Sequence, residues 1–194
     1  MTLSTGSIHL LTRDLRRLHV SEYHRMIEAG VFDEDEHIEL LEGVIVRVSP
    51  QKADHALAVE RLNDPVFVKL PAAFVIRCQL PLSLSEADEP EPDIAVIERV
   101  APRSRRAQPS TACLIFDVAS DSLRKDRRVK APLYARSGIP EYVIVNLQED
   151  CLEVHRDPDP ARGVYRAVET MNKGETFFSM SVPGFRFAVL ELLA

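Results

Sequence analysis

The chain has 194 residues, a length that suits one domain, and its 45% hydrophobic and 28% charged residues are ordinary for a globular protein, which argues against a disordered or fibrous chain. The sequence contains no run of eighteen apolar residues, so we expect no membrane-spanning helix. The formal net charge of −6 argues against a surface coated with basic residues for nucleic-acid binding.

The glycines and cysteines exclude several common types of site. The seven glycines never lie two apart, so the chain has neither a GxGxxG nor a GxxxxGK(S/T) loop, and GxSxG and HExxH motifs are absent as well. Cys78, Cys113 and Cys151 form no CxxC pair and cannot all pair with one another, and the charged N-terminal segment does not resemble a secretory signal. We therefore expect a reduced, cytoplasmic protein that works through side chains rather than a glycine loop.

The first half of the chain predicts alternating helices and strands. In order, we expect a helix from Ser21 to Gly30, a helical turn or the entry to a strand at 38–41, a strand at 44–48, a helix at 53–68 and a strand at 74–84. Ser21 is the expected N-cap of the first helix. Pro65 should break or kink the second helix, because an interior proline removes a backbone hydrogen bond. Pro81 suggests an edge strand or a bulge.

The second half predicts a strand–helix–strand unit followed by antiparallel strands. In order, we expect strands at 93–97 and 112–119, a helix at 123–137, a strand at 142–147, and antiparallel strands at 152–156, 164–168 and 176–178. The strand–helix–strand order suggests a right-handed parallel crossover. The expected fold class is α/β or α+β, in a single domain over residues 1–194 with an N-terminal extension at residues 1–17.

The charges are unevenly distributed along the chain. Residues 103–130 contain eight basic residues and three aspartates and therefore carry +5, which leaves −11 for the rest. The acidic residues gather in two clusters, Asp33, Glu34, Asp35, Glu36, Glu39 and Glu42, and Glu86, Asp88, Glu89, Glu91 and Asp93. Such clusters are either solvated loops and faces or a site for a hard cation beside a phosphate-binding strip.

Asp117 is the most unusual residue of the predicted strands. It interrupts the apolar run Leu114–Ala119, which is expected to be buried on both faces of a sheet. An ionised carboxylate there must find a cation, gain hydrogen bonds or change its pKa. One interpretation is therefore an aspartate at a strand end that accepts backbone N–H bonds or pairs with an arginine, and the other is a metal ligand.

Asp93 strengthens the second interpretation, because it follows Pro92 and begins or ends another apolar strand. Two neighbouring strands can bring Asp93 and Asp117 close together, and paired carboxylates repel each other unless they share a proton or a cation. Mg²⁺ prefers such oxygen ligands. Glu39 is a candidate third carboxylate or else a solvated residue, and Lys130 is either a lysine that orients the nucleophile or a surface lysine paired with Asp126.

Several short segments together resemble a known family. They are ELLEG at 39–43, SP at 49–50 followed by His55, PD at 92–93, LIFDVAS at 114–120, Asp126, VKAPLYA at 129–135 and GIPEYVIV at 138–145. Their order and spacing look like the Uma-two family, described as putative restriction endonucleases of the PD-(D/E)XK nuclease superfamily. The resemblance covers roughly residues 18 to 190, and 114–145 is its most specific part.

The resemblance implies a restriction-endonuclease-like fold, with a mixed central β-sheet flanked by helices and a site for Mg²⁺ or Mn²⁺ at the end of the sheet. It implies that Asp93 and Asp117 bind the metal, that Glu39 contributes, and that Lys130 is the catalytic lysine. In most of the superfamily that lysine lies two residues after the second acid, where this chain has Ala119. His55 matches a family position, although a histidine that ends a helix or fills the core is the favoured interpretation.

Three residues depart from the family pattern. Asp117 stands where the family usually has Glu, Asp121 replaces the proline of a Ser-Pro-Ser segment, and Pro132 falls within the predicted helix that carries Lys130. These departures and the acidic net charge favour a second hypothesis, that the chain is a catalytically degenerate member that acts as a binding or assembly module. The first hypothesis remains a metal-dependent nuclease.

The nuclease hypothesis includes expectations about partners. The substrate is a nucleic acid, with DNA favoured over RNA, and the superfamily's habit of cutting duplexes suggests a homodimer. Basic side chains of the 103–130 segment are expected to contact backbone phosphates, which fix position without reading bases. These residues are Arg103, Arg105, Arg106, Arg124, Lys125, Arg127 and Arg128.

Overall fold

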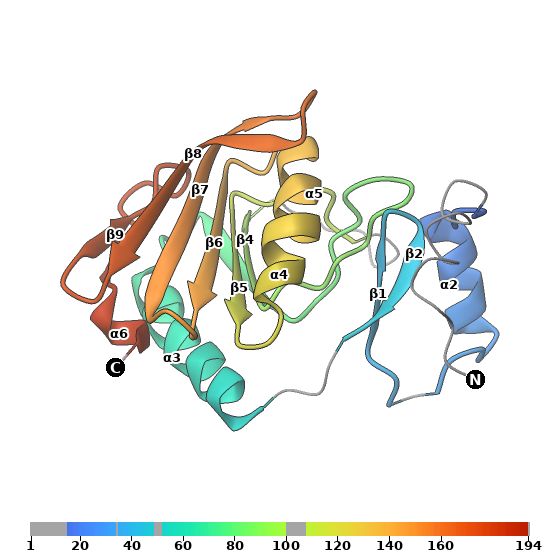
Figure 1. The fold of residues 1–194 in the computed structure, drawn as a ribbon, viewed down its shortest axis with the longest axis horizontal. Coiled ribbons are helices and arrows are strands. Elements are labelled where there is room, and N and C mark those ends of the chain that lie inside the picture. The colour runs from blue at the N-terminus through green and yellow to red at the C-terminus, as the bar shows by residue number, and fades with distance from the viewer. Residues whose placement is uncertain (1–14, 34, 49–51, 100–107, 194) are drawn as a thin grey trace.

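A computed structural model describes residues 15–33, 35–48, 52–99 and 108–193. At its centre is a six-stranded sheet in the order β3-β4-β5-β6-β7-β8 (Figure 1). Strands β5 and β6 are parallel, and the other neighbouring pairs are antiparallel. The strands are β3 (Phe74–Cys78), β4 (Ile94–Glu98), β5 (Leu114–Ala119), β6 (Glu141–Asn146), β7 (Cys151–Asp159) and β8 (Val164–Asn172). The expected mixed sheet is confirmed, as is the parallel strand–helix–strand unit.

Helices cover both faces of the sheet. On one face, α3 (Ala53–Lys69) packs with α6 (Leu190–Leu193) and with the hairpin of β9 (Thr176–Phe178) and β10 (Arg186–Ala188). On the other face lies one continuous helical stretch, made of α4 (Leu123–Lys125), the π-helical turn η1 (Asp126–Lys130) and α5 (Ala131–Arg136) (Figure 1). Because side chains alternate along a strand, the residues of β5 divide between these two layers.

The N-terminal region forms a smaller layer beside the sheet. Helix α2 (Val20–Glu28) packs on the antiparallel hairpin of β1 (Ile38–Leu41) and β2 (Val44–Arg47) around the buried side chains of Tyr23 and Leu40. Backbone hydrogen bonds in both directions between Leu40 and Glu89 tie β1 to the segment that leads into β4. This connection brings β1 close to the strands of the central sheet.

Several expected boundaries are wrong. Helix α2 begins at Val20 rather than after Ser21, because the backbone N–H of His19 already donates to the Glu22 carboxylate at 3.1 Å. The strand expected at 74–84 ends at Cys78, since Gln79 has a φ of 48° and leaves the extended conformation. Helix α3 continues through Pro65 without the expected break. Of the two alternatives left open at 38–41, the structure has the strand.

The strand at Thr176–Phe178 does not extend the central sheet but pairs with β10. Residues 100–107, which follow β4 in the chain, lie outside the described residues. Within the described ranges, none of the helices has both the length and the hydrophobicity that crossing a membrane requires.

Candidate functional site

Asp93 and Asp117 lie side by side on neighbouring strands. Asp93 immediately precedes β4, which runs antiparallel to β5 with Ile94 opposite Phe116. The backbone N–H of Val118 donates to Asp93 Oδ2 at 2.7 Å, and the N–H of Asp93 donates to Asp117 Oδ1 at 3.3 Å. The register of two apolar strands therefore brings the two carboxylates together.

Asp117 points toward the helix that carries Lys130. Its neighbours Phe116 and Val118 pack in the core on the α3 side, so alternation turns Asp117 to the opposite face. There the Lys130 ammonium lies 3.2 Å from Asp117 Oδ1, and the Tyr142 hydroxyl donates to Oδ2 at 3.0 Å. The buried carboxylate thus has a cation and several hydrogen-bond donors, as burial requires.

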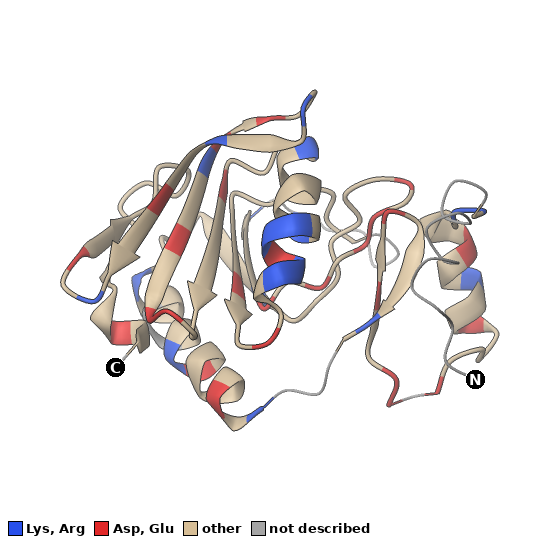
Figure 2. Cartoon of the chain, viewed as in Figure 1, with Lys and Arg blue, Asp and Glu red and all other residues tan. Residues whose placement is uncertain are grey.

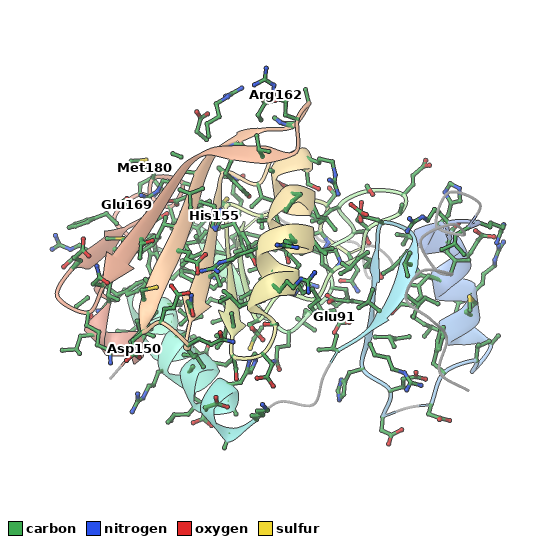
Figure 3. The ribbon with its side chains drawn as sticks, viewed as in Figure 1. Glu91, Asp150, His155, Arg162, Glu169 and Met180 are labelled. Carbon is green, nitrogen blue, oxygen red and sulfur yellow. The ribbon has the colours of Figure 1, made fainter. Side chains whose placement is uncertain are left out.

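Glu39 joins the same cluster from β1. Its carboxylate is buried, with Oε1 2.9 Å from Lys125 Nζ and Oε2 3.7 Å from Lys130 Nζ. The backbone N–H of Glu91 also donates to Oε2 at 3.3 Å, and Figure 3 shows Glu91 between the β1–β2 hairpin and the helix of α4 and α5. Within the described residues, Lys130 forms ion pairs with Asp117 and Glu39 and not with Asp126.

The three carboxyl groups experience different electrostatic environments. Burial raises the pKa of Glu39, but Lys130 and Lys125 outweigh it and leave the pKa below its usual value. Burial also raises the pKa of Asp93, but the hydrogen bond with His55, together with nearby hydrogen bonds and positive charges, outweighs burial and leaves the pKa below its usual value. At Asp117, burial and the neighbouring carboxylates outweigh the effect of Lys130, and the pKa is raised above its usual value. Adjacent acids with pKa values driven apart are common at functional sites, although structural ion-pair networks produce them as well.

His55 contacts the site, which the favoured sequence interpretation did not anticipate. It lies two residues after the start of α3, and its Nε2 is 3.2 Å from Asp93 Oδ1. The hydrogen bond with Asp93 raises the pKa of His55 more than burial lowers it. The sequence signal for this contact was only the position of His55 at a helix start, in a segment that resembles the family.

Asp126 is a second group that the sequence did not single out as titratable. It is buried in the π turn, and the Ser122 hydroxyl donates to it at 2.5 Å. Burial, together with the charge of Asp117, raises its pKa to about 7. A carboxyl group that changes protonation near neutral pH therefore lies in the same π turn as Lys130.

The donor set suits a hard divalent cation, since Glu39, Asp93 and Asp117 all offer carboxylate oxygens. As the side chains lie, the Lys130 ammonium holds the position between Asp117 and Glu39. Across the part of the chain that the structure describes, no three or more His, Cys, Asp or Glu side chains are arranged to hold a metal ion. Asp117 and Glu39 thus share the Lys130 ammonium, whereas the Asp93 carboxylate is held by the Val118 N–H and His55.

The basic residues expected to contact phosphates separate into groups. Arg103, Arg105 and Arg106 lie outside the described residues. Arg127 makes two hydrogen bonds of 2.8 Å to Glu153, and Lys125 is paired with Glu39. Arg124 and Arg128 are exposed on the same helix, where Figure 2 shows basic positions interrupted by an acidic one. Two of the described basic residues are therefore free to face an external anion, and two are engaged with carboxylates.

Comparison with known proteins finds a family and a shared fold. Residues 20–190 match the Uma2 family, described as "Putative restriction endonuclease". The crystal structure of a putative nuclease belonging to DUF820 from Anabaena variabilis ATCC 29413 is similar, with a TM-score of 0.68 and 14% identity over 91% of this chain and 97% of that one. The type IIG restriction endonuclease BpuSI has a TM-score of 0.44 and 16% identity, over 75% of this chain and 17% of that one. No curated protein matches the chain.

Proposed function

The chain belongs to the Uma2 family, and on that premise we propose that it is a nuclease that hydrolyses phosphodiester bonds with the help of Mg²⁺ or Mn²⁺. The observation that carries the proposal is a chain of contacts at one end of the sheet, in which Lys130 pairs with both Glu39 and Asp117 and the backbone N–H of Asp93 donates to Asp117. These residues come from three distant parts of the chain, and three of them are buried charges that a merely structural core would have no need to gather.

The carboxylates of Asp93, Asp117 and Glu39 would hold the divalent cation. When bound, the cation would supply Lewis-acid stabilisation of a phosphoryl oxygen and lower the pKa of a bound water. The backbone N–H of Val118 and the Tyr142 hydroxyl keep the two aspartates in fixed orientations. His55 supports Asp93 from the start of α3.

Lys130 would orient the attacking water and offset the negative charge that develops on the phosphate. Its ammonium remains charged although it is buried, because Asp117 and Glu39 raise its pKa above the usual value against the effect of burial. In the free protein this ammonium bridges Asp117 and Glu39, so it has to move aside when a cation binds there. A flexible four-carbon side chain permits that movement.

The substrate of the proposed reaction is a nucleic acid, and DNA is our first candidate. Arg124 and Arg128 lie on the exposed side of the helix that carries Lys130, where they can contact a backbone phosphate. Arg103, Arg105 and Arg106 remain predicted phosphate contacts. A homodimer also remains a prediction, based on the duplex nature of the expected substrate.

A second candidate function is a non-catalytic binding or assembly module. The observation that favours it is that Asp117 already has a complete set of partners, namely Lys130, two tyrosine hydroxyls and a backbone N–H. A site that is neutralised from within requires no metal. This alternative predicts that the cluster contributes to stability alone.

Mn²⁺ binding and cleavage separate the two functions. If the protein is a nuclease, it binds Mn²⁺ and cleaves DNA, whereas Asp93→Asn and Asp117→Asn lose both properties. Lys130→Met keeps Mn²⁺ binding and loses cleavage by about a hundredfold or more, as expected when a charge that stabilises the transition state is removed. Lys69→Met is the matched control, because Lys69 is ion-paired with Glu191 at the opposite end of α3. Absence of Mn²⁺ binding and of cleavage of DNA and RNA by the wild type would favour the second function.

A further inference from the structure

The helix that carries Lys130 contains a π turn with a consequence for the site. The Ala131 N–H donates to the carbonyl of Asp126, five residues earlier, whereas the Asp126 N–H donates to Ser122, four residues earlier. In a regular α-helix, residues five apart point roughly 140° away from each other, at about 100° per residue. A turn closed between residues five apart brings them to the same side. Lys125 and Lys130 are five residues apart, and both reach Glu39.

Pro132 explains why the helix changes its hydrogen-bond register here. Proline has no N–H, so Pro132 cannot supply the next backbone hydrogen bond of either an α-helix or a π turn. Its ring also disfavours the normal position of the carbonyl four residues earlier, which belongs to Arg128. The extra residue of the π turn is therefore inserted where the helix loses a hydrogen bond in any case. The helix does not break, and its continuation as α5 begins at Ala131.

The two lysines differ in their access to solvent. The Lys130 side chain is 7% exposed and the Glu39 side chain 0%, whereas the Lys125 side chain is 27% exposed. Lys125 therefore joins a fully buried carboxylate to a side chain that solvent already reaches. Arg124 and Arg128, which are exposed, lie on the same helix.

We propose that Lys125 is a second lysine of the site and that it exchanges partners, binding Glu39 in the free protein and a phosphate oxygen of the nucleic acid once a divalent cation occupies Glu39. The proposal rests on the nuclease function proposed above. Glu39 would hold the cation, whose positive charge would offset the carboxylate and so weaken its attraction for the Lys125 ammonium. Lysine binds phosphate as a mobile point charge, so the displaced side chain can follow a phosphate at the mouth of the site.

The proposed exchange predicts that a single variant, Lys125→Met, binds Mn²⁺ more tightly and DNA more weakly than the wild type. Lys125→Met removes a cation that competes for Glu39, so Mn²⁺ should bind about fivefold more tightly in the absence of nucleic acid, on the scale of about 1 kcal/mol for a partly exposed ion pair. The same variant loses a phosphate contact, so its binding to a DNA duplex should weaken and the slope of log affinity against log salt should become shallower by about 0.9. A lysine with only a structural role would weaken both interactions or neither.

The test measures Mn²⁺ affinity by calorimetry without DNA, and DNA affinity by anisotropy of a short fluorescein-labelled duplex in Ca²⁺ over a series of salt concentrations. Lys125→Arg keeps the charge and should restore DNA binding, and Lys69→Met, with its ion pair at the far end of α3, should match the wild type in both assays. Melting curves establish that each variant is folded.

Tighter Mn²⁺ binding together with weaker DNA binding supports the exchange. If the wild type binds Mn²⁺ and cleaves DNA but Lys125→Met behaves like Lys69→Met, or loses affinity for Mn²⁺, the exchange is refuted and the nuclease function stands. If the wild type binds no Mn²⁺ and cleaves nothing, the nuclease function fails, and Lys125 is then an ion-pair partner of Glu39 alone.

Discussion

Replacing Lys130 by methionine gives the sharpest test of how the buried cluster is held together. Lys130 is buried, and its ammonium lies 3.2 Å from Asp117 and 3.7 Å from Glu39, whose charges it neutralises. Methionine approximates the length of the side chain and removes both the charge and the hydrogen bond that Lys130 donates to Asp117. Glu39 keeps the Lys125 ammonium, but the charge of Asp117 is left with hydrogen bonds from Tyr142, Tyr134 and the Asp93 N–H.

The structure indicates that the loss of folding stability in Lys130→Met lies near the lower end of the range for a broken buried ion pair. Removing one partner of such a pair costs about 3–5 kcal/mol, because a charge remains buried without compensation. The remaining donors on Asp117 reduce that cost, and Asp117 can also bind a proton. We therefore expect a loss of about 3 kcal/mol at pH 8, with less lost at pH 5.

The direction of the pH dependence follows from the pKa of Asp117, which burial already raises in the wild type. In the unfolded chain an aspartate loses its proton near pH 3.9, whereas the folded variant keeps it to a higher pH. Unfolding then releases a proton across this window, so the stability of Lys130→Met decreases as the pH rises. A group with a raised acid pKa always contributes in this direction.

Urea denaturation at pH 5, 6.5 and 8 measures the effect, with the double variant Asp117→Asn/Lys130→Met as the partner in a double-mutant cycle. The double variant should recover part of the loss at pH 8, because the uncompensated charge is gone. A loss below about 1 kcal/mol that is independent of pH would refute the reasoning, since exposed ion pairs behave in that way.

Three further predictions concern stability. His155 (labelled in Figure 3) is buried beside Tyr142 and Tyr165, and burial lowers its pKa. As the pH falls, the unfolded chain therefore binds a proton near pH 6.5 before the folded protein does, which reduces the stability of the folded protein. His155→Phe should reduce this loss of stability between pH 7 and 5, as measured by urea denaturation. Burial raises the pKa of Asp126 to about 7, so its buried carboxyl group is charged at pH 8 and protonated at pH 5. Asp126→Asn should therefore raise the melting temperature more at pH 8 than at pH 5. An equal change at the two pH values would show that the buried charge is not the cause. Leu62 is fully buried between α3 and the sheet, and Leu62→Ala should cost about 2–5 kcal/mol in chemical denaturation with an unchanged m-value.

Much of the central sheet could be predicted from local patterns. The apolar run around Asp117 indicated a strand buried on both faces, and all six residues of β5 are buried. The helix between β5 and β6 indicated a parallel pair, which the register confirms. Both features depend on side-chain periodicity and on the length of the connection, and neighbouring residues in the chain determine these directly.

The partners of the site residues depended on the tertiary structure. Whether Glu39 was a solvated acid or a member of the cluster was settled when the backbone bonds between Leu40 and Glu89 brought β1 to the sheet. His55 contacts Asp93 only because α3 packs with its first turn beside the start of β4. Lys125, the last residue of α4 before the π turn, pairs with Glu39 from a strand 86 residues away in the chain. The amino-acid sequence by itself determined which segments form strands and helices and which acids would need a partner, because local sterics and burial periodicity act within a few residues. Which cation each acid received was decided by packing between segments far apart in the chain, where the cost of burying an unpaired charge selects among arrangements that local preferences leave equal.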